Sequence, residues 1–266
     1  MTHRIAAVQM VSTPDVHENI ATMRRLVAEA AAGGAELVVL PEYWPIMGMS
    51  DADKVARREA DGAGPIQDAM AAAARSHGIW LIGGTLPLVA PEPDKVMNSV
   101  LVYDPQGARV ARYDKMHLFG FTKGSESYNE AKTIVPGGAV GSFAGPFGRI
   151  GLSVCYDLRF PELYRAMGEC ALIVVPAAFT YTTGLAHWEV LLRARAIENQ
   201  CYVLAAAQGG THRNGRRTFG HSMLIDPWGE VLAMLPEGEG VVAGAIDPEH
   251  LAGVRASLPA LKHRIL

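Results

Sequence analysis

The order of strand, helix and hairpin signals occurs twice along this 266-residue chain, and this repeat limits the fold more than any other feature. Each half contains strand, helix, strand, helix, strand and a closing hairpin, identified from apolar runs, helical periodicity and turn residues. The first half places these elements, in that order, at residues 4–10, 16–32, 36–42, 64–77, 79–85 and 99–115. The second half places them at residues 149–157, 161–167, 171–179, 187–199, 201–208 and 221–235. Alternating strands and helices are typical of the α/β class.

Both hairpins carry the same turn sequence, Asp-Pro-x-Gly, at 104–107 and at 226–229. Asp at the first position, Pro at the second and Gly at the last favour a type I turn. The second strand of each half also runs into a proline, Pro41 in one and Pro176 in the other. Loose self-similarity is common in α/β proteins and is an alternative explanation, but the matching turns favour a duplicated unit.

Because each half has few helices, we expect them to cover only one face of its sheet. The two sheets then bury their remaining faces against each other, which predicts a four-layer α–β–β–α sandwich of two pseudo-repeated halves with mixed sheets. The strands are continuous apolar runs, as is typical of strands buried on both faces. We expect a single domain over residues 1–266, in which residues 115–148 form a crossover that carries loops to the site.

The composition excludes several classes of protein. A net charge of −3 provides no basic surface of the kind that binds nucleic acid. No apolar stretch reaches the roughly 18 residues of a membrane span, and the N-terminus lacks the features of a secretory signal. Three cysteines, an odd number, do not predict a disulfide framework. We therefore expect a cytoplasmic protein with reduced thiols.

Three side chains suited to nucleophilic catalysis are expected at strand ends, where sites gather in open α/β sheets. Glu42 follows the second strand, Lys115 follows the first hairpin, and Cys155 closes the first strand of the second half. A nearby cation lowers the pKa of a thiol and a carboxylate can accept its proton. Lys115 and the backbone N–H of Tyr156 could then stabilise an oxyanion. Taken alone, Cys155 is better explained as a small core residue, and only its combination with Glu42 and Lys115 favours a nucleophile.

Three segments in this order resemble the signature segments of the nitrilase superfamily of carbon–nitrogen hydrolases: "VVLPEYW", "YDKMHLF" and "GLSVCYDLRFPELYRAM". The resemblance covers nearly the whole chain and implies an α–β–β–α sandwich with a Glu–Lys–Cys triad. Carried over, the triad is Glu42, Lys115 and Cys155. Many members use a further glutamate between the Lys and Cys segments, which implies a role for Glu130 in positioning Lys115 or in shaping the surroundings of the thiol.

Within the superfamily, "TTGLAHWEVLLRARAIENQCYVLAAAQ" and "FGHSMLIDPWGEV" most resemble the deaminated glutathione amidases. The implied activity is hydrolysis of a small carboxylate-bearing amide with release of ammonia through a Cys thioester, with deaminated glutathione as the expected substrate and metabolite repair as the role. An ω-amidase, an N-carbamoyl amino acid hydrolase and a nitrilase remain alternatives, because the triad suits all of them. Gly120 stands where the family commonly has Asp, in a loop expected to border the pocket. The expected substrate-binding residues are Tyr43, Tyr156, Arg159, Phe179, Thr180 and Thr183.

Several neighbouring residues also have structural explanations. Arg159 could bind a substrate carboxylate through a bidentate fork, or it could pair with Asp157 or Glu162. The helical spacing in "RARAIENQ" brings together Arg195 and Glu198, which predicts an ion-pair network that supports the site or a subunit contact.

Two functions of other classes stay open at this point. One is a non-catalytic binding or scaffold protein on the same fold, and the other is a redox-sensing thiol with a resolving cysteine nearby. Cys170 and Cys201 precede apolar strand segments and are expected in the core. The histidines lack paired-ligand spacing and no Gly-rich nucleotide motif follows a strand, so we expect no metal and no cofactor. The expected partners are a small-molecule amide and further copies of the chain, in a homodimer or higher homo-oligomer.

Overall fold

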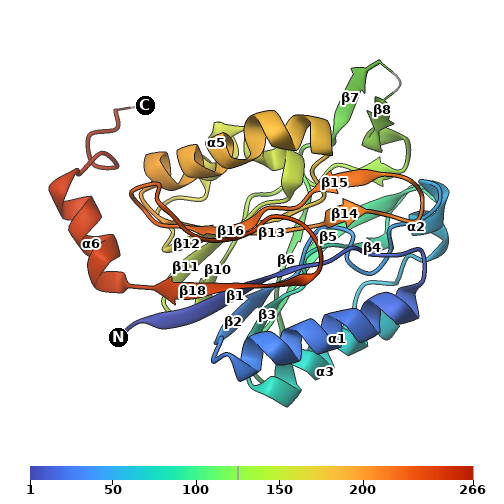
Figure 1. The fold of residues 1–266 in the computed structure, drawn as a ribbon, viewed down its shortest axis with the longest axis horizontal. Helices are drawn as coiled ribbons and strands as arrows, with labels where there is room; N and C mark the ends of the chain where they lie inside the picture. Colours follow the sequence, from blue (N-terminus) through green and yellow to red (C-terminus); the bar gives the residue numbers. More distant parts are fainter. Residues whose placement is uncertain (125, 266) are drawn as a thin grey trace.

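The computed structural model describes residues 1–124 and 126–265, and these form four layers in the order helix, sheet, sheet, helix (Figure 1). Helices α1 and α3 cover the outer face of the first sheet. Helix α5 covers the outer face of the second sheet, with the short α4 packed against it. The expected α/β class and the α–β–β–α sandwich with mixed sheets are confirmed.

Each sheet has a central parallel part flanked by antiparallel strands. In spatial order, the first sheet contains β18 (Gly240–Ile246), β1 (His3–Gln9), β2 (Leu37–Val39), β3 (Trp80–Ile82), β5 (Val96–Tyr103) and β4 (Leu86–Val89), and β5 also pairs with β6 (Arg109–Asp114) and β9 (Ile134–Val135). The second contains β10 (Gly141–Gly145), β11 (Gly148–Leu152), β12 (Leu172–Ala177), β13 (Tyr202–Ala207), β16 (Ser222–Ile225) and β17 (Val231–Leu235). Two small ribbons pair β7 (Gly120–Lys123) with β8 (Glu126–Asn129), and β14 (Gly209–Thr211) with β15 (Arg217–Phe219). The α-helices are α1 (Val16–Ala32), α2 (Ala52–Ala56), α3 (Pro65–His77), α4 (Pro161–Ala166), α5 (Tyr181–Asn199) and α6 (Pro248–Ser257), and Glu130–Lys132 and Cys155–Arg159 form short 3-10 helices.

The internal repeat is visible in the strand register. β1, β2 and β3 are parallel and β5 and β6 follow antiparallel, and β11, β12, β13, β16 and β17 repeat this arrangement. Ile5 lies opposite Leu37 in the first sheet, and Ile150 lies opposite Leu172 in the second. Ile5 and Ile150 are equivalent in the two repeats, and so are Leu37 and Leu172. The two halves therefore share the same strand register.

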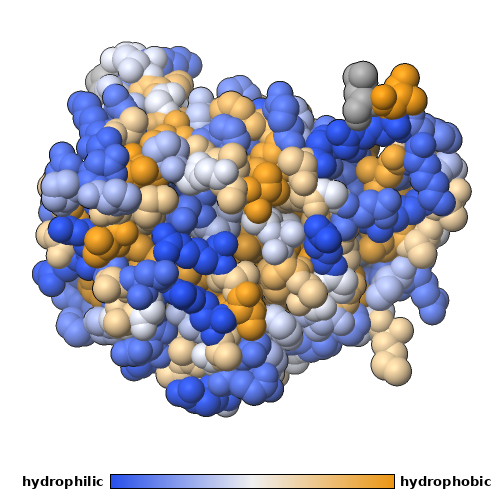
Figure 2. All heavy atoms as spheres, turned by 180° about the vertical axis from the view of Figure 1, so that it is seen from behind, coloured by the Kyte–Doolittle hydropathy of each residue, from blue (hydrophilic) through white to orange (hydrophobic). Residues whose placement is uncertain are grey.

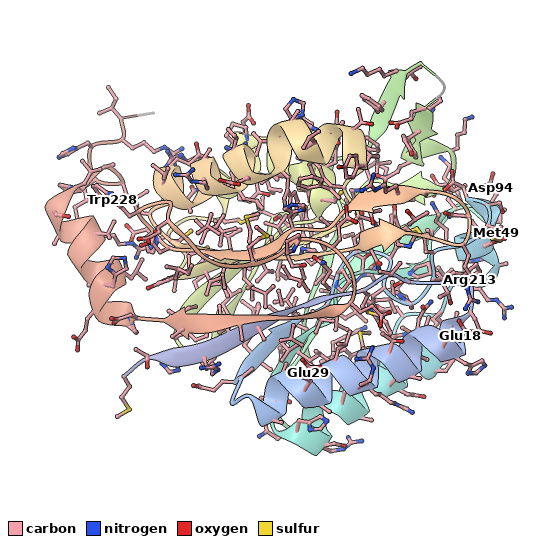
Figure 3. All side chains as sticks on the ribbon, in the orientation of Figure 1. Glu18, Glu29, Met49, Asp94, Arg213 and Trp228 are labelled. Carbon is pink, nitrogen blue, oxygen red and sulfur yellow. The ribbon has the colours of Figure 1, made fainter. Side chains whose placement is uncertain are left out.

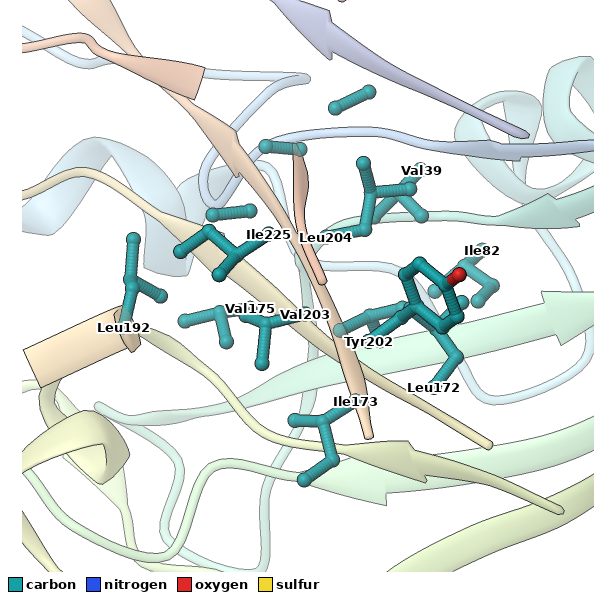
Figure 4. Close-up of a cluster of buried hydrophobic side chains, with 14 of the residues drawn as sticks. Val39, Ile82, Leu172, Ile173, Val175, Leu192, Tyr202, Val203, Leu204 and Ile225 are labelled. Carbon is teal, nitrogen blue, oxygen red and sulfur yellow. The ribbon is translucent and has the colours of Figure 1, made fainter. Parts of the chain in front are cut away.

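The apolar runs are buried because each inner strand contacts a different layer on each face. On β1, Ala6 and Val8 pack in the cluster beneath α1 and α3, while Ile5 and Ala7 join the cluster between the sheets. That central cluster includes Val39 of the first sheet and residues of β12, β13 and β16 (Figure 4). Burial of this kind stabilises by about 25 cal/mol per Å² of apolar surface, so the interface between the sheets holds the two halves together.

Both hairpin turns fold as their sequence predicts. The N–H of Gly107 donates to the carbonyl of Asp104 over 2.8 Å, and the N–H of Gly229 donates to the carbonyl of Asp226 over 3.0 Å. Each Asp side chain accepts the backbone N–H groups two and four residues further on. The two glycines have φ of 78° and 91°, in the left-handed region that favours glycine.

Helix α5 begins at Tyr181, so the expected start at residue 187 was wrong. The Thr180 side chain caps this end by accepting the N–H of Thr183. Two threonines and Gly184 in the first turns lower the helix propensity, which hid the start from the sequence pattern. A methyl group on Gly184 would lie 2.4 Å from Phe219, so a close contact with β15 requires this glycine.

Two further expectations needed correction. The strand expected at residues 149–157 ends at Leu152, and a 3-10 helix begins at Cys155, because the chain turns sharply there. The crossover expected at residues 115–148 contains β7, β8, β9 and β10 in addition to loops. In Figure 1 the β7–β8 ribbon projects beyond the end of α5.

Polar and apolar residues are interspersed on the face seen from behind (Figure 2). Among the helices in residues 1–124 and 126–265, none is long and apolar enough to cross a bilayer.

Candidate active site

Lys115 lies between two carboxylates. Its Nζ is 2.9 Å from Oε1 of Glu42, and 2.7 Å and 3.0 Å from the two oxygens of Glu130. Lys115 is fully buried and Glu42 is 1% exposed, so water cannot screen these ion pairs. The backbone of Lys115 is fixed by hydrogen bonds to the carbonyl of Asn98 and from the N–H of Gly137. The three charged side chains are therefore held in one geometry.

Glu42 is oriented by several donors besides Lys115. Its Oε1 accepts from Nδ2 of Asn98 at 3.0 Å, and its Oε2 accepts from the N–H of Ala178 at 2.9 Å. Its carboxylate lines the same pocket as Cys155 and helps to raise the pKa of that thiol. Glu42 follows β2 and Cys155 follows β11, so the facing ends of the two sheets bring these groups together.

Cys155 lies at the start of a turn that the following residues hold in place. Its φ is 50°, a backbone conformation uncommon for residues other than glycine. The buried carboxylate of Asp157 accepts from the N–H of Val154 at 2.8 Å and from the hydroxyl of Tyr113 at 2.7 Å. It also contacts Nδ1 of His117 at 2.7 Å. These contacts compensate for the strain of presenting the thiol at a sharp turn.

Arg195 of α5 supports the same turn from the other side. Its Nε and Nη2 donate to the carbonyl of Leu158 at 3.1 Å and 2.7 Å. Its Nη1 pairs with Glu198 at 2.7 Å. The ion pair expected from "RARAIENQ" is thus present. The same Arg195 also supports the 3-10 helix that begins at Cys155.

The electrostatics of the site favour a neutral thiol at rest. Burial, together with the carboxylates of Glu42 and Glu130, raises the pKa of Cys155 well above its ordinary value, and Lys115 opposes this rise only in part. Burial by itself would lower the pKa of Lys115, but Glu130 and Glu42 outweigh it and raise that pKa. Burial by itself would raise the pKa of Glu130, but Lys115 outweighs it and lowers that pKa. Lys115 thus lowers the thiol pKa as expected, but burial and the carboxylates dominate, so the net shift is upward. The thiol needs a base to become a nucleophile.

A small pocket of about 10 Å³ opens over Cys155, with room for about one water molecule. Four of the six residues expected to bind substrate line it, and Tyr43 and Arg159 do not. The pocket is lined by Glu42, Phe119, Glu130, Cys155, Tyr156, Ala178, Phe179, Thr180, Thr183 and Arg216.

Tyr43 and Arg159 lie beside this pocket. The hydroxyl of Tyr43 donates to Oε1 of Glu130 at 2.6 Å, and burial with the nearby carboxylates raises its pKa, which keeps the hydroxyl protonated. The guanidinium of Arg159 lies 5.7 Å and 5.5 Å from the ring centres of Tyr156 and Phe179 and bonds to His187. The alternative pairing of Arg159 with Asp157 or Glu162 is not found within the described residues.

Sequence reasoning missed three residues that line the pocket, Phe119, Ala178 and Arg216. Phe119 immediately precedes Gly120, so the loop does border the pocket, but Gly120 itself begins β7 and is exposed. Arg216 lies beside two other arginines of the same loop and strand, Arg213 and Arg217, and nothing in the sequence pattern distinguishes it from them. Only the folded structure brings Arg216 to the pocket.

Neither of the other two cysteines lines the pocket over Cys155. Cys170 and Cys201 are buried, as expected. Within the described residues, no group of three His, Cys, Asp or Glu side chains could hold a metal ion. The arrangement around Cys155 can transfer a proton from a thiol to a carboxylate, with a buried ammonium beside both. That is the chemistry of attack on an electrophilic carbon.

Comparison with known proteins agrees with this chemistry. A family model described as carbon–nitrogen hydrolase matches residues 4–256. The chain is 41% identical over 265 residues to the deaminated glutathione amidase of Synechocystis sp., covering 98% of this chain and 97% of that one. It is 41% identical over 267 residues to the deaminated glutathione amidase of Homo sapiens, covering 98% and 81%. Among solved structures, the C. elegans NitFhit protein matches with a TM-score of 0.91 at 38% identity, and the match covers 99% of this chain and 65% of the NitFhit chain. The protein is therefore an amide-hydrolysing enzyme and belongs to the carbon–nitrogen hydrolases of the nitrilase superfamily.

Proposed function

We propose that this amidase hydrolyses deaminated glutathione through a thioester on Cys155. Glu42 acts as general base and acid, Lys115 stabilises the oxyanion, and Glu130 positions Lys115. The observation that carries these roles is the buried chain of hydrogen bonds that links Glu42 to Lys115 and Lys115 to Glu130, in the wall of the pocket that also contains Cys155. The substrate is supported by the names of relatives that match nearly the whole chain.

The reaction proceeds in two stages. Glu42 takes the proton of the Cys155 thiol while the sulfur attacks the amide carbonyl, and Lys115 with the N–H of Tyr156 stabilises the oxyanion. The oxyanion collapses, the C–N bond breaks, and protonated Glu42 gives its proton to the departing nitrogen. Glu42 then takes a proton from a water that attacks the thioester. When the C–S bond breaks, Glu42 returns that proton to the sulfur.

The proposed substrate fixes the leaving group. In deaminated glutathione the scissile amide joins a keto-acid acyl group to the nitrogen of cysteinylglycine. The departing group is then that amine, so the release of ammonia expected from the sequence does not hold for this substrate and would apply only to a primary amide. Phe179, Thr180 and Thr183 line the small pocket beside the thiol, where the reacting carbonyl group would lie. Arg159, next to the Tyr156 and Phe179 rings, would bind the acyl carboxylate.

The test is hydrolysis of a substrate panel by the natural protein and by Cys155→Ala. The panel contains deaminated glutathione, the primary amide of a keto acid, an N-carbamoyl amino acid and a nitrile. We expect the highest kcat/KM with deaminated glutathione, an acyl-enzyme mass on Cys155, and no turnover by Cys155→Ala. Substantial activity of the variant would refute the nucleophile, preference for another panel member would refute the substrate, and no turnover at all would favour a scaffold.

We also propose a homodimer or higher homo-oligomer that works in the cytoplasm. Leu185 and Val190 of α5 are 68% and 69% exposed, and large apolar side chains on one helix suit burial against a second copy. Three free cysteines suit a reducing compartment.

A further inference from the structure

A second hollow lies next to the pocket over Cys155. It is a cleft of about 310 Å³, at the lower end of the range for small-molecule sites. Its walls come from the segment that follows Glu42, from β8 and from the loop between β14 and β15. Figure 3 shows its rim residue Met49 at the end of the molecule where Arg213 lies. Arg216 lines both the cleft and the pocket, so the two hollows are neighbours.

Arg216 is incompletely satisfied in this position. Its Nη2 donates to the carbonyl of Ala178 at 2.8 Å, and its guanidinium lies 5.2 Å from the ring centre of Tyr128. Its Nε is buried and has no hydrogen-bond partner within residues 1–124 and 126–265. A buried guanidinium N–H without an acceptor costs free energy, and such a group in a native site suggests a missing partner.

The other cleft residues suit a small anion attached to an amphipathic group. Lys54 and Arg216 bring two positive charges and Asp51 one negative charge. Lys54 pairs with the exposed Asp51 at 2.8 Å, which leaves Arg216 as the positive charge free of a carboxylate among the described cleft residues. Tyr43 and Met47 add aromatic and apolar surface. The lining as a whole favours a molecule with one carboxylate and a short, partly apolar body.

We propose that this cleft binds the leaving group of the substrate and that Arg216 binds its terminal carboxylate. The inference deepens the proposed function and rests on it, because deaminated glutathione ends in the carboxylate of glycine. The cleft begins at Tyr43, next to Glu42, which protonates the departing amine in the proposed mechanism. Arg159, beside the Tyr156 and Phe179 rings of the pocket, is proposed to bind the acyl carboxylate, so the two arginines would serve the two ends of the substrate. Arg216 thereby selects amides whose amine part carries a carboxylate over simple primary amides.

The experiment compares deaminated glutathione with its analogue in which the glycine carboxylate is a carboxamide. The natural protein should hydrolyse the carboxylate form with a kcat/KM about 10- to 100-fold higher, as expected for one hydrogen bond to a charged group. Arg216→Gln should remove most of this preference. The matched control is Arg213→Gln, because Arg213 is an exposed arginine nearby that pairs with Glu18 (Figure 3). This control should keep the preference of the natural protein.

A second measurement needs no variant. Cysteinylglycine should inhibit the natural protein, and cysteinylglycinamide should inhibit it about 10-fold or more weakly. Three results would refute the leaving-group site while the proposed function stands. They are equal hydrolysis of deaminated glutathione and its carboxamide analogue, equal inhibition by cysteinylglycine and cysteinylglycinamide, and an unchanged preference in Arg216→Gln. Failure of the natural protein to hydrolyse deaminated glutathione would overturn both.

Discussion

Replacing Glu130 with glutamine tests the ion-pair network around Lys115 most directly. The carboxylate of Glu130 accepts from Nζ of Lys115 with both oxygens, from the Tyr43 hydroxyl at 2.6 Å and from the N–H of Phe119 at 2.7 Å. An amide has one accepting oxygen, so Glu130→Gln removes the charge and leaves at least one of these donors without an acceptor.

The expected cost follows from the burial of the pair. Removing one partner of a buried ion pair destabilises a protein by about 3–5 kcal/mol. Lys115 keeps Glu42 at 2.9 Å, so we expect the lower end, about 3 kcal/mol. Loss of a group that positions an oxyanion donor should also lower kcat/KM by about 10²–10³-fold, as loss of such a donor does.

Urea unfolding followed by tryptophan fluorescence would measure the stability, and steady-state hydrolysis would measure kcat/KM. The matched control is Glu126→Gln, four residues earlier in the same connection. Glu126 accepts from the Thr182 hydroxyl at 2.9 Å and forms no ion pair within the described residues, so its replacement should cost about 1 kcal/mol or less. If Glu130→Gln matches this control in stability and retains full kcat/KM, Glu42 alone suffices to hold Lys115 and the network argument is wrong.

Two further predictions concern titration. Glu42→Gln should lower the pKa of Cys155, because the Glu42 carboxylate helps to raise it while Lys115 stays in place. Thiolate absorbance against pH in a Cys170→Ala/Cys201→Ala background checks this, and an unchanged or higher pKa would contradict it. Burial lowers the pKa of His212 to about 4, below its unfolded value of about 6.5, so the unfolded state binds more protons between these values. Stability should fall by about 3 kcal/mol as pH drops from 6.5 to below 4, and His212→Gln should remove that part of the slope in urea unfolding; a slope equal to that of the natural protein would refute the role of His212.

Local chemistry explains which parts of the fold could be predicted from the sequence. The two Asp-Pro-x-Gly turns and the apolar strands carry their own signals, so the repeated order of elements and the sandwich were predicted correctly. The start of α5 was missed because Thr182, Thr183 and Gly184 are poor helix formers, and a tertiary contact with Phe219 decides the conformation there. The turn at Cys155 was missed because a continuous apolar run does not show where the backbone bends.

The candidate site shows a similar division. Glu42, Lys115 and Cys155 could be placed together because strand ends converge, and their catalytic roles stay predictions that the proposed variants test. Glu130 lies in an aperiodic connection, so only the resemblance to a known family pointed to it. Arg216 carries no local signal at all, because only the fold brings it to the wall of both hollows.

The shared register of the two halves has an evolutionary consequence. Counting along the matched strands places Met10 at the position equivalent to Cys155, and Ala177 at the position equivalent to Glu42. A symmetrical ancestor assembled from two identical copies would have had the same residues at both places. In the proposed mechanism, one copy handles protons and the other forms the covalent bond. A single copy would need both the carboxylate and the thiol to catalyse the reaction by itself, so the two halves depend on each other.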